Sequence, residues 1–166
     1  MFSFALYGRV GQGVRSASRI IAKAAFYSHF KTQALIPYAN GVQTGFIKVD
    51  KLPISSRSPA EPDVFLIFDR KIDAHLKNAK KGSIIIVNSG EKVKIKTKNK
   101  VKIFHINATQ LALEATQRQT PNIAMLGAFV KTFGKLPLKH VKKAIEDEGL
   151  LKELPLLETG MKSVKR

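Results

Sequence analysis

Three glycines near the amino terminus are the residues with the clearest chemical potential in this chain. Gly8, Gly11 and Gly13 lie between an apolar run, Phe2 to Tyr7, and a segment with apolar residues at the helical period. Those periodic residues are Ala17, Ile20, Ile21, Ala24 and Ala25. The order predicts a buried strand, a glycine loop and an amphipathic helix. Because the first backbone N–H groups of a helix are free, the loop is a candidate anion site.

The spacing of these glycines is not that of the common nucleotide loops. It reads G-x-x-G-x-G, whereas dinucleotide-binding loops read G-x-G-x-x-G and place an acidic residue about 20 positions later. No acidic residue precedes Asp50 in this chain. Val14 and Arg15 stand where a P-loop has Lys and Ser or Thr. On the glycine pattern alone, an anion site and a tight turn that binds nothing are equally compatible with the sequence.

Arginines surround the glycine loop. Arg9 and Arg15 flank it, and Arg19 lies one turn further along the expected helix. A guanidinium beside free backbone N–H groups is well suited to hold a phosphate. The same arginines could equally be exposed to solvent or contact a partner subunit.

The other polar residues indicate no catalytic centre and no metal site. The four histidines, His29, His75, His105 and His140, are scattered, and none has metal-ligand spacing to another. The chain has no cysteine, so it offers no iron–sulfur ligand and no thiol chemistry. The adjacent acids from Glu146 to Glu148 are expected to be solvated. We therefore expect no catalytic residue in this chain.

Composition describes a basic globular protein. The 166 residues are 44% hydrophobic and 25% charged, which suits one domain of ordinary size. No signal peptide or membrane-spanning stretch is recognisable, so a cytoplasmic location is expected. The net charge of +17, from 29 basic and 12 acidic residues, predicts an acidic partner.

Alternating apolar runs and helical patterns predict an α/β, Rossmann-like single domain, with a mostly parallel sheet and helices on both faces. The expected strands are Phe2–Tyr7, Lys31–Tyr38, Val42–Asp50, Val64–Phe68, Ser83–Val87 and Val101–Ile106. After the helix of the glycine loop, the expected helices are Ile72–Lys80, Ala108–Gln117, Asn122–Phe133 and Leu138–Glu148. We expect the domain to occupy residues 1–157 and a basic tail to follow over 158–166, frayed from Met161 to Arg166.

Lysines alternate with smaller residues from Glu91 to Lys102. Strict alternation is typical of an edge strand or ribbon with one lysine face. Such lysines can block edge-to-edge aggregation, dock an acidic partner subunit, or grip nucleic acid. Binding of nucleic acid is the least favoured of these, because no exposed aromatic residues are interleaved and no nucleic-acid-binding motif is present.

Four motifs in order resemble one protein family. They are GRVGQGVRSASRIIAKAAF, ALIPYANGVQTGFIKVDKLPI, EPDVFLIFD and NIAMLGAFVKTFG. They resemble the gamma subunit of 2-oxoacid:ferredoxin (acceptor) oxidoreductases of the pyruvate, 2-oxoglutarate or 2-ketoisovalerate type. That pattern has a G-x-G-G-Q-G-V loop, a proline–aromatic–glycine segment, a V-R-x-S-x-x-P-I strand end, an E-P-D strand and an N-x-x-x-L-G-A helix. The resemblance extends from about Phe2 to about Ile145.

The resemblance implies a non-catalytic, Rossmann-like subunit of a larger enzyme. Such enzymes convert a 2-oxoacid and coenzyme A to an acyl-CoA and CO2, and pass electrons to ferredoxin or flavodoxin. The implied partners are alpha, beta and ferredoxin-like delta subunits, which hold thiamine diphosphate, Mg and 4Fe-4S clusters; none is bound by this chain alone. Coenzyme A is the co-substrate, and the gamma subunit covers its side of the site and supports assembly.

The resemblance also implies which residues make contacts with coenzyme A or with a sister subunit. In and beside the loop these are Gly8, Arg9, Gly11, Gln12, Gly13, Val14, Arg15 and Ser16. In a facing segment they are Pro37, Tyr38, Asn40 and Gly45. The chain departs from the pattern at Val10, where the family has glycine, at Ser16, where threonine is usual, and at Gln43, where arginine is frequent.

Two other hypotheses remain open from the sequence. The chain could be a free-standing nucleotide- or nucleic-acid-binding module that kept the fold without the partners. It could also be a subunit with a purely structural role, in which case loop substitutions would disturb assembly but not the response to coenzyme A.

Overall fold

The computed structural model describes all residues from 1 to 166, folded around one seven-stranded sheet. The strands are β1 (Phe2–Arg9), β2 (Lys31–Leu35), β3 (Tyr38–Ala39), β4 (Val42–Asp50), β5 (Val64–Ile67), β6 (Ile84–Asn88) and β7 (Lys102–Ile106). The α-helices are α1 (Val14–Tyr27), α2 (Ala108–Thr116), α3 (Asn122–Phe133), α4 (Leu138–Asp147) and α5 (Leu154–Ser163). None of these helices combines the length and the hydrophobicity that crossing a membrane requires.

The sheet has the order β2-β4-β1-β5-β6-β7, with the short β3 beside β4. Strands β1, β5, β6 and β7 pair in parallel, and β4 is antiparallel to β1, β2 and β3. All strands except β4 therefore run in the same direction. The predicted α/β fold with a mostly parallel sheet is confirmed.

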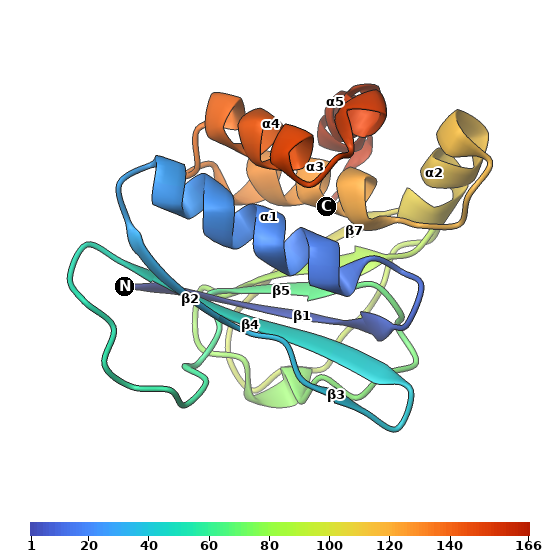
Figure 1. Ribbon diagram of the computed structural model, residues 1–166. Coiled ribbons are helices and arrows are strands. Elements are labelled where there is room, and N and C mark those ends of the chain that lie inside the picture. The colour runs from blue at the N-terminus through green and yellow to red at the C-terminus, as the bar shows by residue number, and fades with distance from the viewer.

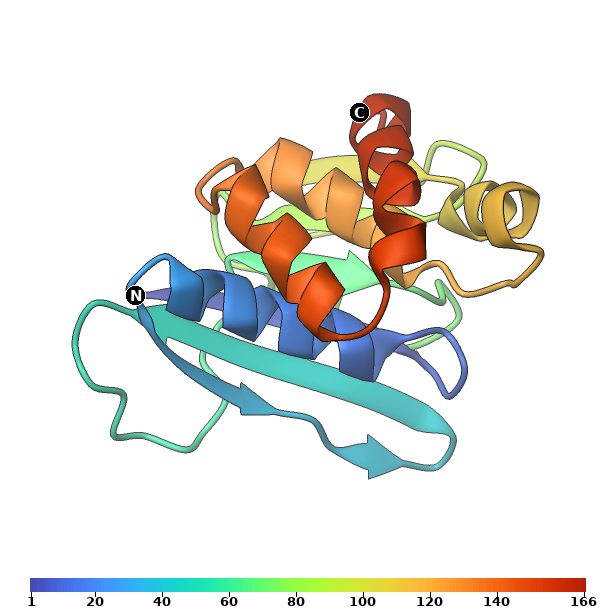
Figure 2. The same cartoon turned by 45° about the horizontal axis from the view of Figure 1, so that its top comes forward.

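All five α-helices lie on one face of the sheet (Figures 1 and 2). Helices α1 and α3 pack on that face, α4 packs on α1, and α5 packs on α3. Together they bury a large apolar core, which includes Phe4, Leu66 and Phe129. The opposite face carries a smaller core, formed by Ala5, Phe65, Ile67 and residues of irregular segments. The expectation of helices on both faces was wrong, because the connections from β5 to β6 and from β6 to β7 contain no α-helix.

The helix expected over Ile72–Lys80 is reduced to a 3₁₀ turn, Leu76–Asn78. The backbone N–H of His75 donates to the side chain of Asp73 at 2.8 Å, and that of Lys71 donates to Asp69 at 2.9 Å. Such local turns compete with helix formation. The buried alanines of this segment, Ala74 and Ala79, still pack against the sheet.

The strand expected over residues 91–102 was also wrong, since residues 91–101 form no strand and only β7 begins within the range. The alternation itself is seen in the exposure of the side chains: Lys92 and Lys94 are exposed, whereas Val93 and Ile95 are half-buried. An extended segment without a neighbouring strand shows the same alternation as a strand does. The backbone of this segment is tied instead to the 3₁₀ turn, through Lys98 N–H to Lys77 carbonyl at 3.0 Å.

The carboxyl-terminal residues are structured rather than frayed. Helix α5 extends to Ser163, and Lys165 then exchanges two backbone hydrogen bonds with His105 of β7. The helix lies very close to α3, because a Cβ on Gly160 would be 2.3 Å from the carbonyl oxygen of Ala124. The basic tail expected over 158–166 is therefore largely a packed helix.

Candidate functional site

A cleft of about 400 Å³ opens above the amino terminus of α1. The glycine loop and the first turn of α1 form one side, and Gln43 of β4 adjoins them. The other side comes from the connection between α2 and α3, the start of α3 and the connection between α4 and α5. The lining residues are Arg9, Val10, Gly11, Gly13, Val14, Arg15, Ser16, Gln43, Arg118, Thr120, Asn122, Leu150 and Glu153.

The glycine loop leaves the amino terminus of α1 open to this cleft. Gly11 and Gly13 have φ angles of 91° and 80°, a left-handed conformation that glycine adopts without strain. Gly13 is the N-cap residue and has no side chain, so no capping group accepts the first N–H groups of the helix. These donors and the positive end of the helix dipole favour an anion at this position.

Helix α3 begins at the same cleft. Its N-cap is Pro121, which provides no capping hydrogen bond. The side chain of Asn122 is buried, with 3% exposure, and lies against Gly13. Its carbonyl oxygen accepts from the Ile123 N–H at 2.9 Å, while its amide nitrogen has no acceptor. Two helix amino termini and the Asn122 N–H₂ group, which has no acceptor within the chain, therefore border one cleft.

The charge of the cleft is positive. Arg15 and Arg118 are exposed, and neither forms an ion pair within the chain. Glu153 is the single carboxylate among the lining residues. Burial raises the pKa of Glu153, and the positive charge of Arg118 opposes that rise in part. The two arginines are thus available to an anionic ligand.

Arg9 has a different role from Arg15. Its guanidinium Nε donates to Asp69 at 2.6 Å, which joins the glycine loop to the residues after β5. Burial raises the pKa of Asp69, but hydrogen bonds from the Lys71 N–H and from Arg9 outweigh it, so the net pKa is lowered. A second opening of about 470 Å³ lies on this side of the loop, between Gln12 and Asn88.

Gly8, Gln12 and Val14 shape the loop, and of these three only Val14 also lines the cleft. A Cβ on Gly8 would be 2.6 Å from Val14 Cγ2, so only glycine permits this contact. Gln12 Oε1 accepts from the Arg9 N–H at 2.7 Å. Val14 is buried. The loop residues that the resemblance selected thus divide into bracing residues and cleft-facing residues, the latter including Gly11, Gly13, Arg15 and Ser16.

The facing segment is near the cleft but does not line it at the expected positions. Asn40 and Gly41 form the hairpin turn, with φ angles of 51° and 78°. Gly45 lies under α1, where a Cβ would be 2.0 Å from Ser18 Oγ. Tyr38 is 60% exposed, and the Pro37 carbonyl accepts from Gln43 Nε2 at 3.0 Å. Pro37 thus anchors Gln43, which is the residue of this segment that reaches the cleft.

Seven residues that line the cleft were not among the predicted site residues: Val10, Gln43, Arg118, Thr120, Asn122, Leu150 and Glu153. Pro121 immediately precedes the expected helix Asn122–Phe133, and a second free helix terminus could have been inferred from it. Nothing in the local sequence indicates that this helix start lies beside the glycine loop. For Leu150 and Glu153 we see no local signal.

Comparison with known proteins identifies the family. A family model described as pyruvate ferredoxin/flavodoxin oxidoreductase matches residues 3–165. The chain belongs to this family. Among curated proteins, the pyruvate synthase subunit PorC of Thermotoga maritima is 35% identical over 156 residues, covering 87% of this chain and 81% of its own length. The pyruvate/ketoisovalerate oxidoreductases common subunit gamma of Thermococcus kodakarensis is 34% identical over 162 residues, covering 89% and 86%.

Solved structures agree with this assignment. The pyruvate oxidoreductase subunit PORC of Thermotoga maritima superimposes with a TM-score of 0.83 and 29% identity, covering 99% of this chain and 97% of that one. A 2-oxoglutarate:ferredoxin oxidoreductase from Magnetococcus marinus, solved with 2-oxoglutarate, coenzyme A and succinyl-CoA, shares the fold at 17% identity and a TM-score of 0.80. The chain covers 97% of its own length but only 30% of that protein. The predicted gamma-type subunit of an oxidoreductase is confirmed.

Proposed function

We propose that this chain works in the cytoplasm as the gamma subunit of a 2-oxoacid:ferredoxin oxidoreductase and supplies the phosphate-binding part of its coenzyme A site. Two observations support this: its membership in the family, and the convergence of the α1 and α3 amino termini on one cleft. The second observation carries the assignment of the site. Coenzyme A carries a diphosphate and a further phosphate, which are the groups that such a cleft would hold.

Within the cleft, each kind of group has a distinct task. The free N–H groups of the first turn of α1 would donate to one phosphate, and the Asn122 amide would donate from the α3 side. Arg15 and Arg118 would add charge-assisted hydrogen bonds. Holding the phosphates would orient the remainder of coenzyme A, so that its thiol reaches a reaction centre on other subunits.

The chemistry itself belongs to partner subunits in this proposal. No group of three or more His, Cys, Asp or Glu side chains in the structure is arranged to hold a metal ion, and the chain has no cysteine for a 4Fe-4S cluster. We assign thiamine diphosphate with Mg to the alpha and beta subunits and the clusters to a ferredoxin-like delta subunit. Thiamine diphosphate would supply the carbanion chemistry of decarboxylation, and ferredoxin or flavodoxin would accept the electrons.

The test is the Michaelis constant for coenzyme A of the assembled enzyme. We expect Arg15→Ala and Arg118→Ala each to raise this constant roughly ten-fold, since a hydrogen bond to a charged group contributes about 1.5–3 kcal/mol. The Michaelis constant for the 2-oxoacid should not change. Arg19→Ala is the matched control, because Arg19 lies on α1 and is exposed but does not line the cleft.

Unchanged values for both cleft variants would contradict the phosphate role. If the variants instead fail to assemble while wild-type protein does, the cleft is a subunit contact. If wild-type protein assembles with no oxidoreductase subunit but is stabilised by a free nucleotide, the chain is a free-standing binding module.

A further inference from the structure

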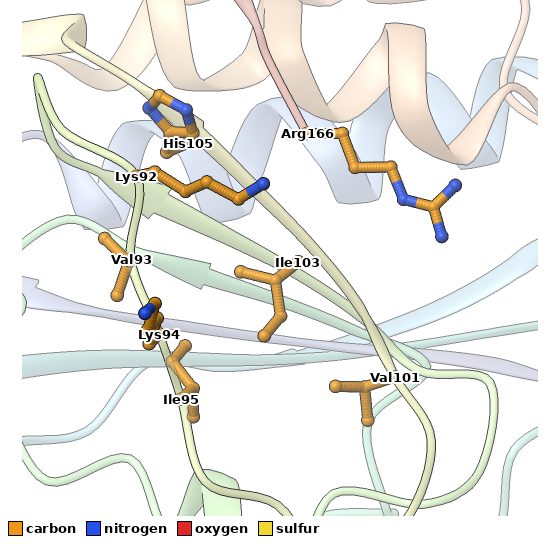
Figure 3. A pocket seen from close by; sticks show the side chains of 8 residues that line it. All are labelled: Lys92, Val93, Lys94, Ile95, Val101, Ile103, His105 and Arg166. Carbon is orange, nitrogen blue, oxygen red and sulfur yellow. The ribbon is translucent and has the colours of Figure 1, made fainter.

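A second groove lies far from the glycine loop in sequence, at the open edge of the sheet. It has a volume of about 370 Å³ and lies between the segment Lys92–Ile95 and β7 (Figure 3). Its floor is aliphatic and its rim is basic. The lining residues are Lys92, Val93, Lys94, Ile95, Val101, Ile103, His105 and Arg166. We call it the β7 groove.

The edge of β7 in this groove has free backbone groups. The Lys102 N–H donates to the Ser83 carbonyl at 2.9 Å, so the backbone N–H and C=O of Lys102 point toward the neighbouring strand. Because backbone groups of successive residues point to opposite sides of a parallel strand, those of Ile103 and His105 point away from the sheet. His105 exchanges hydrogen bonds of 2.8 and 3.0 Å with Lys165, whereas Ile103 has no partner on this side. The edge of β7 thus pairs with Lys165 at His105 and is unpaired at Ile103.

The floor of the groove consists of four half-buried aliphatic side chains: Val93, Ile95, Val101 and Ile103. These side chains also pack into the smaller core of the sheet. A ligand that fills the groove must therefore present apolar side chains to the floor. No Phe, Tyr or Trp side chain lines it, whereas sites for single-stranded nucleic acid commonly stack bases on such rings.

The rim carries a large excess of positive charge. Three of the lining residues, Lys92, Lys94 and Arg166, are basic and none is acidic. Residues 96–102 add four further lysines and no acidic residue to the same segment. None of these lysines, nor Lys165 or Arg166, forms an ion pair within the chain. The occupant of the groove should consequently carry carboxylates beside its apolar side chains.

We propose that the β7 groove is the docking site of an acidic, extended segment of another subunit of the complex, which adds as a strand to the edge of β7. This inference rests on the proposed function, since it takes the partner from the same enzyme. Addition of a strand would use the free N–H and C=O of Ile103, and alternate side chains would enter the aliphatic floor. The lysines would set affinity and orientation through opposite charge.

The experiment measures binding of the full-length chain to the purified remaining subunits, over a series of NaCl concentrations and after nuclease treatment. We expect the double variant Lys92→Glu with Lys94→Glu to bind at least ten-fold more weakly than wild type at low salt. The matched control, Lys131→Glu with Lys139→Glu, makes the same change of charge on exposed residues of α3 and α4 and should alter binding less than two-fold. Wild-type binding should weaken steeply with salt.

A photo-crosslinking residue at position Lys94 identifies the occupant in the assembled complex. The proposal requires a crosslink to a segment of a partner subunit that is rich in Asp and Glu. Equal binding of the groove variant and wild type, a crosslink to nucleic acid, or loss of binding on nuclease treatment would overturn it while leaving the proposed function intact. Failure of wild-type protein to bind any subunit would instead contradict the proposed function, and this inference with it.

Discussion

At the scale of single residues, the glycine loop contains two kinds of residue. Some line the cleft, and others hold the loop in its conformation. Gly13 combines a left-handed φ with a position where a Cβ would be 2.6 Å from the Asn122 side chain. Only glycine lets α1 and α3 begin so close together. Arg15 is free, whereas Arg9 is engaged by Asp69. One arginine of the loop is therefore used within the fold, and the other has no partner within the chain.

The ion pair between Arg9 and Asp69 gives a prediction about pH. The pKa of Asp69 is lowered below its usual 3.8 in the folded protein. Its carboxylate therefore stabilises the fold above that usual pKa, and the contribution is lost as pH falls through the folded pKa. We expect Arg9→Ala to lower the free energy of unfolding at pH 7 by no more than about 1 kcal/mol, because Arg9 is half-exposed. Urea denaturation at a series of pH values measures this.

The difference between Arg9→Ala and wild type should shrink as the pH falls below 3.8, where protonation removes the partner charge. Arg15→Ala is the control, since Arg15 has no ion pair and its substitution should produce no such dependence on pH. A difference that stays constant from pH 7 to acid would show that Arg9 stabilises the loop by packing alone.

The sequence predicted one half of the cleft and missed the other. The glycines and Arg15 are adjacent in sequence, and their spacing before an amphipathic pattern is a local signal. Arg118 and Asn122 lie about a hundred residues later, and their proximity depends on how α3 packs against α1. Long-range packing of this kind leaves no trace in local periodicity. In the facing segment, the strand register places Gln43 opposite Gly8, which local sequence does not indicate.

At the scale of elements, the contact between α3 and α5 fixes the side of the cleft that lies opposite the loop. A Cβ on Gly127 would be 2.2 Å from the Leu157 carbonyl oxygen, and a Cβ on Gly160 equally close to Ala124. Small residues at both positions let the two backbones touch. The connection before α5 carries Leu150 and Glu153, so this contact also positions two residues of the cleft.

We expect Gly160→Ala to destabilise the protein by about 1–2 kcal/mol. The new methyl group meets backbone atoms of α3, and overpacking of this kind costs roughly 1–3 kcal/mol, while helix propensity returns at most about 1 kcal/mol. Thermal denaturation measures the change, at about 2–4 °C per kcal/mol. Thr159→Ala, an exposed neighbour on α5, is the control and should change stability by less than about 0.5 kcal/mol. A stabilised Gly160→Ala would contradict the close contact.

Most expected helices match observed ones, and the exceptions have local or long-range causes. Helix α3 matches its expected range, because Pro121 precedes it and Gly134 follows it. Residues 72–80 have helical spacing, but Asp69 and Asp73 divert their backbone into local turns. Helix α5 was missed because its apolar residues stand among Lys, Glu and Gly at the end of the chain. Its formation depends on the contact with α3.

At the scale of the whole molecule, the α-helices all lie on the same face of the sheet. Helices cover one face of the sheet, while the other face is covered only by irregular segments. Beside the glycine loop, Val10 and Tyr38 are 66% and 60% exposed. The net charge of +17 is concentrated in part on the lysines of the β7 groove. A chain with a positively charged cleft, exposed apolar residues and unpaired positive charge is suited to act within an assembly.

The proposed role as a gamma subunit is tested most directly by affinity purification of the tagged chain from its source cells. The purified material is then examined by mass spectrometry and an activity assay. We expect a thiamine-binding pair of subunits and a small cluster-carrying protein to be recovered with the chain. The purified material should also oxidise a 2-oxoacid in a coenzyme A-dependent reaction with an artificial electron acceptor. Recovery of the chain alone, or only with nucleic acid that high salt removes, would contradict the proposed role.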